Sequence, residues 1–451
     1  MIEKKDIIAA IATSTVGSTI GIVRVSGKGC RELVASLLNK PIKKARYSYL
    51  RKIIKGDKIL DEVLVIFFQG PKSYTGEDMI EIHCHGGYVN TRRIYENILE
   101  KGARSAHRGE FTKRAFFNGK LDLIQAESIN NLINSNNSIL ADNSVKMMNG
   151  IFSRRIEELR DKIIEIIAYL EAFIDFPEDD VEEVSEAFLD DRLNKIISDI
   201  KVLIRSFDIY KRLSDGIKVA IAGKTNVGKS SLLNAILKEE KAIVTNIPGT
   251  TRDILEHQLY INGLNVIFFD TAGLRDSEDT VEKIGIKRAM NKIEQSELLI
   301  LMFDISSSIT EEEKELLEKT KNKNKIVVLN KCDQEKYLKD YQKLVKDVDH
   351  LTLSLKTSEG FDAFEKRLHE ELEPSNFIDS NVEFFIDNPR YIQSLKNVCD
   401  ICIKIIDKKD IPPEFIAEDL KETRKGLSEI IGEVYKDDIL DKIFSTFCIG
   451  K

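Results

Sequence analysis

Long hydrophobic runs are missing from this chain of 451 residues. The best candidate, Leu298–Phe303, is far shorter than the ~20 apolar residues that a membrane-spanning helix needs. The first residues, Met1–Asp6, lack the extended apolar segment of a secretory signal peptide. The sequence therefore predicts a protein of the cytoplasm without a membrane partner.

Cysteine is also scarce, with six residues scattered along the chain. Scattered cysteines in a large chain do not indicate a disulfide framework. Cys399 and Cys402 have the spacing of a metal or redox pair. They lie in a helical apolar pattern and lack a second pair, which favours packing in a core over a metal site.

Positive charge is in deficit, because 68 Lys and Arg residues face 75 Asp and Glu residues and leave a formal net charge of −7. This balance argues against a protein coated in nucleic-acid-binding charge. The exception is the stretch from Lys40 to Lys58, in which eight basic residues are interleaved with Tyr47 and Tyr49. Such a stretch can hold an RNA backbone, and a solvated hairpin is the alternative.

Length and composition fit a globular protein of about three domains. The sequence predicts a multidomain chain that combines α/β and all-α parts. We expect an N-terminal α+β domain at 1–118, a helical segment at 119–213, a doubly wound α/β domain at 214–374 and a second helical segment at 375–451. Apolar stripes on both helical segments predict that these two pack together, with the α/β domain inserted between them.

The stretch Ile217–Ser230 carries the most specific motif. An apolar strand ends at Gly223, and Gly228, Lys229 and Ser230 follow before a helical pattern, which is the phosphate-binding loop G-x-x-x-x-G-K-S in its strand–loop–helix context. Glycines let backbone N–H groups converge on phosphate oxygens. Lys229 reaches the β/γ-phosphates and Ser230 offers a hydroxyl to Mg²⁺. The predicted nucleotide contacts in this loop are Asn226, Val227, Gly228, Lys229, Ser230 and Ser231.

Later strand ends indicate that the nucleotide is GTP. Asp270–Gly273 follows one buried-type strand, where an acidic residue can hold the metal through water and a glycine can approach the γ-phosphate. Asp333 follows another, and it can accept the hydrogen bonds of guanine N1–H and the 2-amino group, which adenine does not offer in that pattern. The predicted contacts downstream of the phosphate loop are Thr245, Asn246, Ile247, Pro248, Gly249, Thr250, Thr251, Asp270, Thr271, Ala272, Gly273, Asn330, Lys331, Asp333 and Ser354.

The switch segments set the requirements for hydrolysis. Thr251 is the expected second hydroxyl ligand of Mg²⁺. Leu274 stands where Ras-type enzymes carry the glutamine that orients the attacking water. Because leucine cannot orient water, catalysis needs another water-orienting group and another source of positive charge.

With these motifs the chain resembles the MnmE (TrmE) family of tRNA-modification GTPases, which carries the same hydrophobic substitution at Leu274. The resemblance implies a potassium ion where an arginine finger would otherwise insert, ligated by Asn226, Thr245, Ile247 and Thr250. It also implies two catalytic residues in this unit: Glu282 orients the catalytic water, and Lys229 binds the phosphates. From the residues alone, Glu282 would be a solvated carboxylate near a helix start.

The N-terminal part carries a second set of candidate residues. Alternation along the expected strand Met79–His85 places Glu81, His83 and His85 on one face, which suits a polar ligand pocket, a solvated face or, as a third alternative, a metal site. The segments 73–78, 108–112 and 119–127 resemble the N-terminal signatures of the family. The resemblance implies a homodimer through this domain and a site for a tetrahydrofolate derivative (5-formyl- or methylene-tetrahydrofolate) at Arg24, Glu81, Lys120 and Lys451.

The last residues are Cys448, Ile449, Gly450 and Lys451. They do not fit a prenylation signal, which needs aliphatic residues after the cysteine. They resemble the C-terminal C-x-G-K motif of the family, in which the cysteine is needed for tRNA modification. Cys448 is a plausible nucleophile or ligand, and a frayed tail is the alternative.

The resemblance implies hydrolysis of GTP with Mg²⁺ and K⁺, which opens and closes the two GTPase domains of a dimer. It also implies a flavin-containing partner, MnmG, in a heterotetramer of two plus two chains. Together they would add an aminomethyl or carboxymethylaminomethyl group at C5 of the wobble uridine of certain tRNAs. A ribosome-assembly GTPase and a folate-dependent one-carbon transferase with a regulatory GTPase domain are the alternatives.

Overall fold

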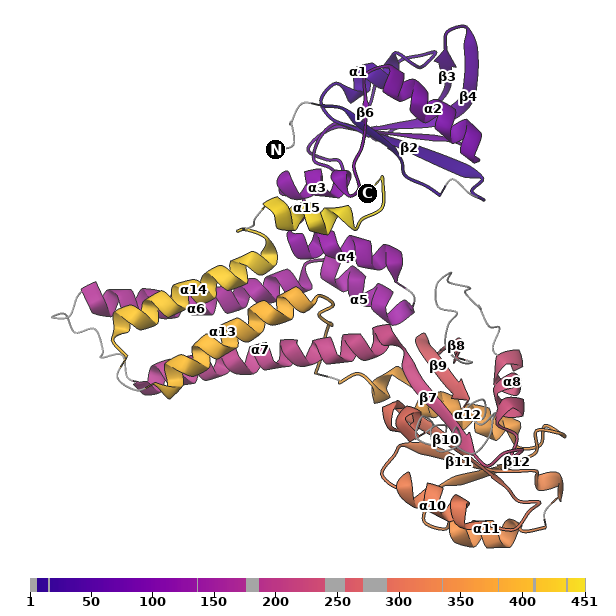
Figure 1. The fold of residues 1–451 in the computed structure, drawn as a ribbon. Coiled ribbons are helices and arrows are strands. Elements are labelled where there is room, and N and C mark those ends of the chain that lie inside the picture. The colour runs from indigo at the N-terminus through magenta and orange to yellow at the C-terminus, as the bar shows by residue number, and fades with distance from the viewer. Residues whose placement is uncertain are drawn as a thin grey trace, which may run out of the picture. The chain divides into compact units, whose positions relative to one another are not determined.

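The computed structural model of the chain describes the residues in the following ranges: 6–14, 17–135, 137–175, 186–239, 256–270, 290–334, 336–379, 381–408, 411–434 and 437–450. The chain divides into two compact units (Figure 1). The first unit consists of Met1–Asn134, Ser144–Ile200 and Arg390–Lys451. The second unit consists of Ser135–Asn143 and Lys201–Pro389. Among the described helices, none is both long and apolar enough to cross a membrane.

The first unit begins with a six-stranded sheet in the order β3-β4-β5-β2-β1-β6. Its strands are β1 (Ile8–Ile11), β2 (Ile20–Ser26), β3 (Ser48–Lys55), β4 (Lys58–Phe68), β5 (Met79–His85) and β6 (Arg104–Ser105). Helices α1 (Cys30–Ala35) and α2 (Tyr88–Glu100) pack on one face, and the core between them is apolar. The predicted N-terminal mixture of strands and helices is confirmed.

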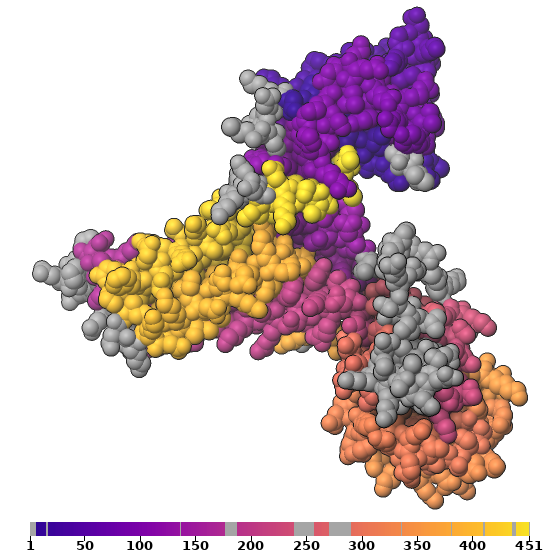
Figure 2. All heavy atoms as spheres, viewed as in Figure 1, coloured from indigo at the N-terminus to yellow at the C-terminus, as the bar shows by residue number. Residues whose placement is uncertain are grey.

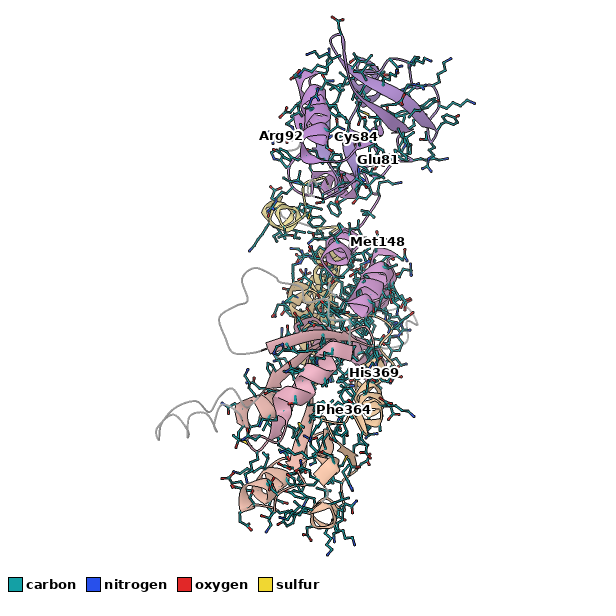
Figure 3. The ribbon with its side chains drawn as sticks, turned by 90° about the vertical axis from the view of Figure 1, so that its right-hand side faces the viewer. Glu81, Cys84, Arg92, Met148, Phe364 and His369 are labelled. Carbon is teal, nitrogen blue, oxygen red and sulfur yellow. The ribbon has the colours of Figure 1, made fainter. Side chains whose placement is uncertain are left out.

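The alternation predicted for β5 is confirmed. Ile80, Ile82 and Cys84 are buried in the core under the helices, whereas Glu81 and His83 lie on the other face and are only half-buried. Figure 3 labels Glu81 and Cys84 in this part of the chain. Within the described ranges, no group of three or more His, Cys, Asp or Glu side chains could hold a metal ion. The face of Glu81 is therefore polar, and the metal alternative gains no support.

The rest of the first unit is helical. Its helices are α3 (Glu110–Phe117), α4 (Leu123–Asn134), α6 (Ile151–Asp175), α13 (Pro389–Asp407), α14 (Pro413–Ile431) and α15 (Asp437–Ser445), and α5 (Ser138–Met148) and α7 (Glu186–Asp215) each run across the division between the units. Helix α6 lies along α14, far away in sequence (Figure 1). Cys399 and Cys402 are buried in α13, and burial, with Cys399 beside it, raises the pKa of Cys402 to about 12. The core role predicted for this pair is confirmed.

The second unit is a doubly wound sheet in the order β12-β11-β10-β7-β9-β8, in which only β8 is antiparallel to its neighbour. Its strands are β7 (Ile217–Gly223), β8 (Glu256–Ile261), β9 (Leu264–Asp270), β10 (Leu298–Asp304), β11 (Lys325–Asn330) and β12 (His350–Leu353). The helices with described bounds are α8 (Lys229–Glu239), α10 (Glu311–Lys319), α11 (Leu338–Leu344) and α12 (Phe361–Glu371), with short 3₁₀ turns at Cys332–Gln334 and Pro374–Asn376. The predicted fold class is confirmed.

Both faces of this sheet are covered, which explains why its strands read as continuous apolar runs. In β10, Ile300 and Met302 enter one core and Leu301 and Phe303 enter the other. In a doubly wound sheet, ligands bind beyond the carboxyl ends of the strands where the strand order reverses. In this sheet that point lies between β7 and β10, directly beside the phosphate-loop motif.

The compact unit around this sheet is wider than residues 214–374. Leu140 of α5, Ile209 of α7 and Phe385 all belong to one of its two cores. The Asn143 amide donates to the carbonyl of Phe385 (2.9 Å) and accepts from the N–H of Phe385 (2.7 Å). Both bonds are buried, so they fix this part of α5 to the segment that follows α12.

Candidate functional site

The phosphate loop connects β7 to α8 and closes around Lys229. The Lys229 side chain is almost fully buried, and its ammonium donates to the carbonyls of Gly223 (2.9 Å) and Lys224 (2.8 Å). An added Cβ at Gly223 would lie 2.4 Å from the Met302 carbonyl, and one at Gly228 would lie 2.5 Å from the Asn330 amide nitrogen. Only glycine therefore fits at either position, and the loop is held in the shape that cradles a phosphate.

The end of β11 is tied to the phosphate loop by Asn330. Its buried side-chain amide donates to the carbonyl of Val227 (2.7 Å), and its amide oxygen accepts from the N–H of Leu355 (3.4 Å). The second contact uses the backbone of Leu355, so it does not depend on the side chain at this position. Asn330 thus joins the loop after β12 to the loop after β7.

Asp333 lies in the 3₁₀ turn after β11 with an exposed carboxylate. The Ser354 hydroxyl donates to Asp333 Oδ1 (2.7 Å) and also accepts from the N–H of Thr357 (3.3 Å). The hydrogen bond from Ser354 lowers the pKa of Asp333. The carboxylate therefore remains an acceptor at neutral pH, which is the state that a guanine edge with two donors requires.

Asp304 is a site residue that the sequence reasoning missed. It ends β10 in register with Asn330, and its carboxylate pairs with the Lys331 ammonium at 2.6 Å. Burial by itself raises the pKa of Asp304, but hydrogen bonds from Lys331 and Ser306 outweigh it and hold the pKa below its usual value. Its position in the sequence could have indicated this, because Asp304 is an acidic residue at the end of a buried-type strand. The carboxyl ends of parallel strands meet at the edge of the sheet where ligands bind.

Several predicted residues can be placed only in part. Asn226 is exposed and has a left-handed φ of 62°, and Ser230 and Ser231 lie in the first turn of α8. Asp270 is the last residue of β9. The predicted residues outside the described ranges are Thr245, Asn246, Ile247, Pro248, Gly249, Thr250, Thr251, Thr271, Ala272, Gly273, Leu274, Glu282 and Lys451.

In the first unit, Arg24 and Glu81 face each other across neighbouring strands. Two guanidinium nitrogens of Arg24 donate to Glu81 Oε1, at 2.8 and 3.1 Å. The guanidinium lies over the rings of Tyr74 (5.3 Å) and Phe111 (5.7 Å), both from the N-terminal signatures. His83 Nε2 lies 3.4 Å from the other Glu81 oxygen. The result is a half-buried ion pair with aromatic walls on the face of the sheet away from α1 and α2.

The C-terminal motif reaches this ion pair. Arg24 Nη1 donates to the carbonyl of Gly450 (3.1 Å), and the N–H of Gly109 donates to the carbonyl of Cys448 (3.4 Å). Figure 2 shows this end of the chain against the N-terminal part. Two backbone hydrogen bonds therefore hold this segment in place, which disfavours a frayed tail, while the side chains of Cys448 and Ile449 stay exposed. Lys120 is exposed and donates to the carbonyl of Pro71 (3.2 Å).

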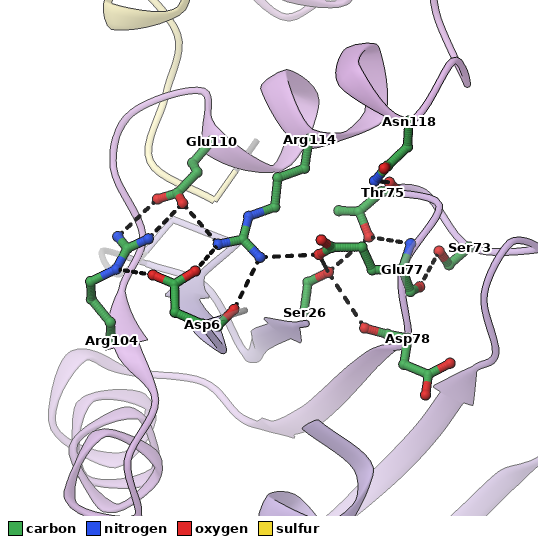
Figure 4. A network of polar contacts seen from close by, with 10 residues as sticks. All are labelled: Asp6, Ser26, Ser73, Thr75, Glu77, Asp78, Arg104, Glu110, Arg114 and Asn118. Carbon is green, nitrogen blue, oxygen red and sulfur yellow. Dashed lines mark hydrogen bonds and ion pairs between the residues drawn. The ribbon is translucent and has the colours of Figure 1, made fainter. Parts of the chain in front are cut away.

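The acidic residues of the N-terminal signatures form a buried network around Arg114 (Figure 4). Arg114, only 3% exposed, bonds Asp6 (2.6 Å), Glu77 (3.1 Å) and Glu110 (3.1 Å). Arg104 pairs with both Asp6 and Glu110 at 2.7 Å. Burial alone raises the pKa values of Asp6 and Glu110, but the guanidinium hydrogen bonds outweigh it and lower both. These carboxylates are structural.

Another signature pair also has a structural role, because Asp122 and Gln125 form a capping box at the start of α4. The Asp122 carboxylate accepts from the Gln125 N–H (2.8 Å), and the Gln125 amide oxygen accepts from the Asp122 N–H (2.9 Å). Each side chain satisfies a backbone N–H that the first turn of the helix leaves without a partner. The signatures therefore combine fold-determining residues with the residues that surround Arg24.

Replacing Arg114 with methionine should destabilise the first unit by roughly 3 kcal/mol at neutral pH, because it removes the buried cation shared by Asp6, Glu77 and Glu110 and leaves only Arg104 beside Asp6 and Glu110. Lowered carboxyl pKa values stabilise the fold above the unfolded values of 3.8 and 4.5, and this stability is lost as the pH falls below them. The difference in the free energy of unfolding between wild type and Arg114→Met should therefore be smaller near pH 3 than at neutral pH. Urea unfolding followed by circular dichroism at both pH values measures this difference.

The control is Arg108→Met, which changes an exposed arginine six residues before Arg114. It should shift stability by less than about 0.5 kcal/mol at either pH. An Arg114→Met variant as stable as wild type at neutral pH would contradict a structural role for the network.

The doubly wound sheet carries a phosphate loop with a buried lysine, Lys229, after β7. It also carries an acceptor carboxylate, Asp333, after β11. Together these features define a P-loop GTPase. The chain matches the family descriptions "MnmE helical domain" over residues 123–448 and "GTP-binding protein TrmE N-terminus" over residues 7–120. It belongs to the MnmE family of tRNA modification GTPases.

Two relatives cover nearly the whole chain. The tRNA modification GTPase MnmE of Clostridioides difficile is 40% identical over 459 residues, which is 99% of each chain. That of Aquifex aeolicus is 40% identical over 453 residues, which is 98% of this chain and 99% of the other. Among solved structures, the G domain of the T. maritima FeoB iron transporter is 27% identical and covers 34% of this chain and 97% of its own, with a TM-score of 0.26.

Proposed function

We propose that this chain is a potassium-dependent GTP hydrolase that works with a flavoprotein partner of the MnmG type. Together they add an aminomethyl or carboxymethylaminomethyl group at C5 of the wobble uridine of certain tRNAs, in the cytoplasm. The observation that carries the proposal is the C-terminal motif at the Arg24–Glu81 pair, in a chain that also has a guanine-nucleotide site. An exposed thiol two residues from the Gly450 carbonyl that contacts Arg24 suits group transfer, and the GTPase unit supplies a switch.

In the nucleotide site, each residue has a defined task. The loop N–H groups and Lys229 bind the phosphates, and Asp333, oriented by Ser354, accepts from the guanine edge. Ser230, in the first turn of α8, and Thr251 would hold Mg²⁺. Bound Mg²⁺ would neutralise charge on the β- and γ-phosphates.

The residues at the proposed potassium site are Asn226, Thr245, Ile247 and Thr250. Within the described ranges the exposed Asn226 side chain has no hydrogen-bond partner, so its amide oxygen is available to a cation. Carbonyl and amide oxygens are suitable ligands for a hard monovalent cation. Bound K⁺ would supply the positive charge of an arginine finger, while Glu282 orients the water.

The residues around Arg24 fit a tetrahydrofolate derivative. A carboxylate such as Glu81 suits the donor edge of a pterin, and cations such as Arg24, Lys120 and Lys451 suit carboxylates of the glutamate tail. Tyr74, which is only partly buried, offers apolar ring surface beside the pair, and the buried Phe111 ring supports the Arg24 guanidinium from within the core. The folate would supply a one-carbon unit there, and Cys448 would act on the same site.

We further propose a homodimer formed through the N-terminal domain and a heterotetramer with two copies of the flavoprotein. For the functional division of the chain we propose the bounds expected from the sequence, with 1–118 for folate and dimerisation, 119–213 and 375–451 for the helical domain and 214–374 for the GTPase motifs, although the compact unit around the GTPase sheet extends beyond them.

Expression of this chain in bacteria that lack their own copy should restore the C5 modification of wobble uridines, measured by mass spectrometry of digested tRNA. The Asp333→Ala variant should not restore it, because it removes the acceptor for guanine. The matched control Asp340→Ala changes an exposed carboxylate of the same unit and should restore it fully. Unmodified tRNA with altered ribosome profiles would instead favour a ribosome-assembly GTPase.

A further inference from the structure

We propose that the edge of the N-terminal sheet formed by residues 40–55, named here the basic edge, docks the phosphate backbone of the tRNA. This inference rests on the proposed function, because it names where that substrate first binds. The basic edge comprises the loop before β3 and β3 itself, which is the outermost strand of the sheet.

The basic edge is positively charged, whereas the chain as a whole has a negative net charge. Residues 40–55 contain seven Lys and Arg residues and no Asp or Glu, in a chain with a net charge of −7. Lys40, Lys43, Lys44 and Lys52 are exposed and make no ion pair with the described residues. Lys55 is the exception, because it pairs with Glu100. Exposed ammonium groups without carboxylate partners are available to phosphates.

The loop that carries these lysines is held in place by guanidinium groups of α1 and β3. Arg31 Nη2 donates to the carbonyl of Ile42 (2.8 Å), and Arg51 donates to the carbonyls of Lys40 (3.2 Å) and Pro41 (3.1 Å). These arginines consolidate the loop, which leaves the lysines to carry the free charge. A loop ordered before binding loses less conformational entropy when a ligand docks.

An aromatic platform lies within the same charged surface. The Tyr47 ring is 58% exposed and lies 4.7 Å, centroid to centroid, from Tyr49, and the Arg51 guanidinium lies 4.7 Å from the Tyr49 ring. The Tyr49 hydroxyl accepts from the Lys44 N–H (2.7 Å). An exposed ring supported by a second ring and surrounded by cations is the surface on which an unpaired base stacks.

Protection of an edge strand is the competing explanation for these lysines, because charge on a sheet edge discourages pairing with other chains. That explanation does not account for Lys52 of β3, because its backbone N–H and carbonyl already bond Asn39. Lys43, Lys44 and Tyr47 precede the strand, where they would protect no backbone ladder. The loop residues therefore distinguish docking from edge protection.

The test measures binding of the full-length chain to an unmodified tRNA transcript with a wobble uridine, by fluorescence anisotropy at several salt concentrations. The double variant Lys43→Ala/Lys44→Ala should bind about tenfold or more weakly near 50 mM salt, and its log–log salt slope should be shallower by roughly 1.5–2. Lys43→Arg/Lys44→Arg should keep the wild-type slope, because it keeps both charges.

The aromatic part is tested separately. Tyr47→Ser should lose at least about fivefold in affinity with little change of slope, whereas Tyr47→Phe, which keeps the ring, should bind as wild type does. Lys101→Ala/Lys396→Ala, a pair of exposed lysines elsewhere in the first unit, is the control and should keep affinity and slope.

Unchanged affinity and slope in the Lys43→Ala/Lys44→Ala variant would overturn the inference, as would tighter binding of wild type to phosphatidylserine vesicles than to tRNA. If the wild-type chain restores wobble modification in cells but Lys43→Ala/Lys44→Ala binds tRNA with an unchanged salt slope, docking is rejected and the proposed function stands. If the variant has a shallower salt slope but the wild-type chain does not restore modification, docking is supported and the proposed function is rejected.

Discussion

In potassium-free sodium buffer, GTP turnover by this chain is expected to fall by roughly 10³–10⁵-fold, the range that an arginine finger contributes. The reason is Leu274, which cannot orient the attacking water and leaves the developing charge on the phosphates to a bound cation. Asn226, the described residue among the proposed ligands of this ion, is exposed in the phosphate loop. Phosphate release at matched ionic strength in KCl and NaCl measures the effect.

The variant Asn226→Ala should bring the rate in potassium close to the rate in sodium, while nucleotide affinity changes little. Asn234→Ala, an exposed asparagine of α8, is the matched control and should keep the full potassium response. Turnover at full speed in sodium would reject the potassium mechanism.

The variant Cys448→Ser should abolish wobble-uridine modification and leave GTP turnover within about twofold of wild type. The thiol is exposed in the tail that contacts Arg24, and a serine hydroxyl of similar size is a much weaker nucleophile and ligand at neutral pH. Modification is read from digested tRNA and turnover from phosphate release, with the same preparations.

Ser445→Ala serves as the control for that variant, because Ser445 is exposed near the same end of the chain and bonds only within α15. It should keep both activities. A parallel loss of modification and GTP turnover in Cys448→Ser would show that the cysteine acts on the fold or on the nucleotide site instead.

Local sequence patterns predicted much of this architecture. The loop after β7 and the acceptor after β11 could be located because strand, loop and helix follow one another within a few residues. The alternation of β5 placed Glu81 opposite the core because side chains change face at every residue. Such patterns depend only on residues close together in the sequence, so they can be recognised without knowledge of the tertiary fold.

Contacts between distant segments could not be predicted in this way. Gly450 meets Arg24 across 426 positions of sequence, and Lys331 meets Asp304 across the ends of two strands. The roles of Asp6 and Glu110 depend on Arg114, a buried cation that reads from sequence as an ordinary surface residue. Each case is decided by packing and desolvation, which have no local signature.

The participation of Leu140, Ile209 and Phe385 in the core beneath the GTPase sheet has a practical consequence for dissecting this chain. A fragment cut at 214 and 374 would leave those three side chains behind and expose the apolar surface they cover. Extending it to 201–389 recovers two of them but still omits Leu140, which arrives from 135–143. A contiguous fragment that includes all three side chains must therefore begin near residue 135 and extend past Phe385.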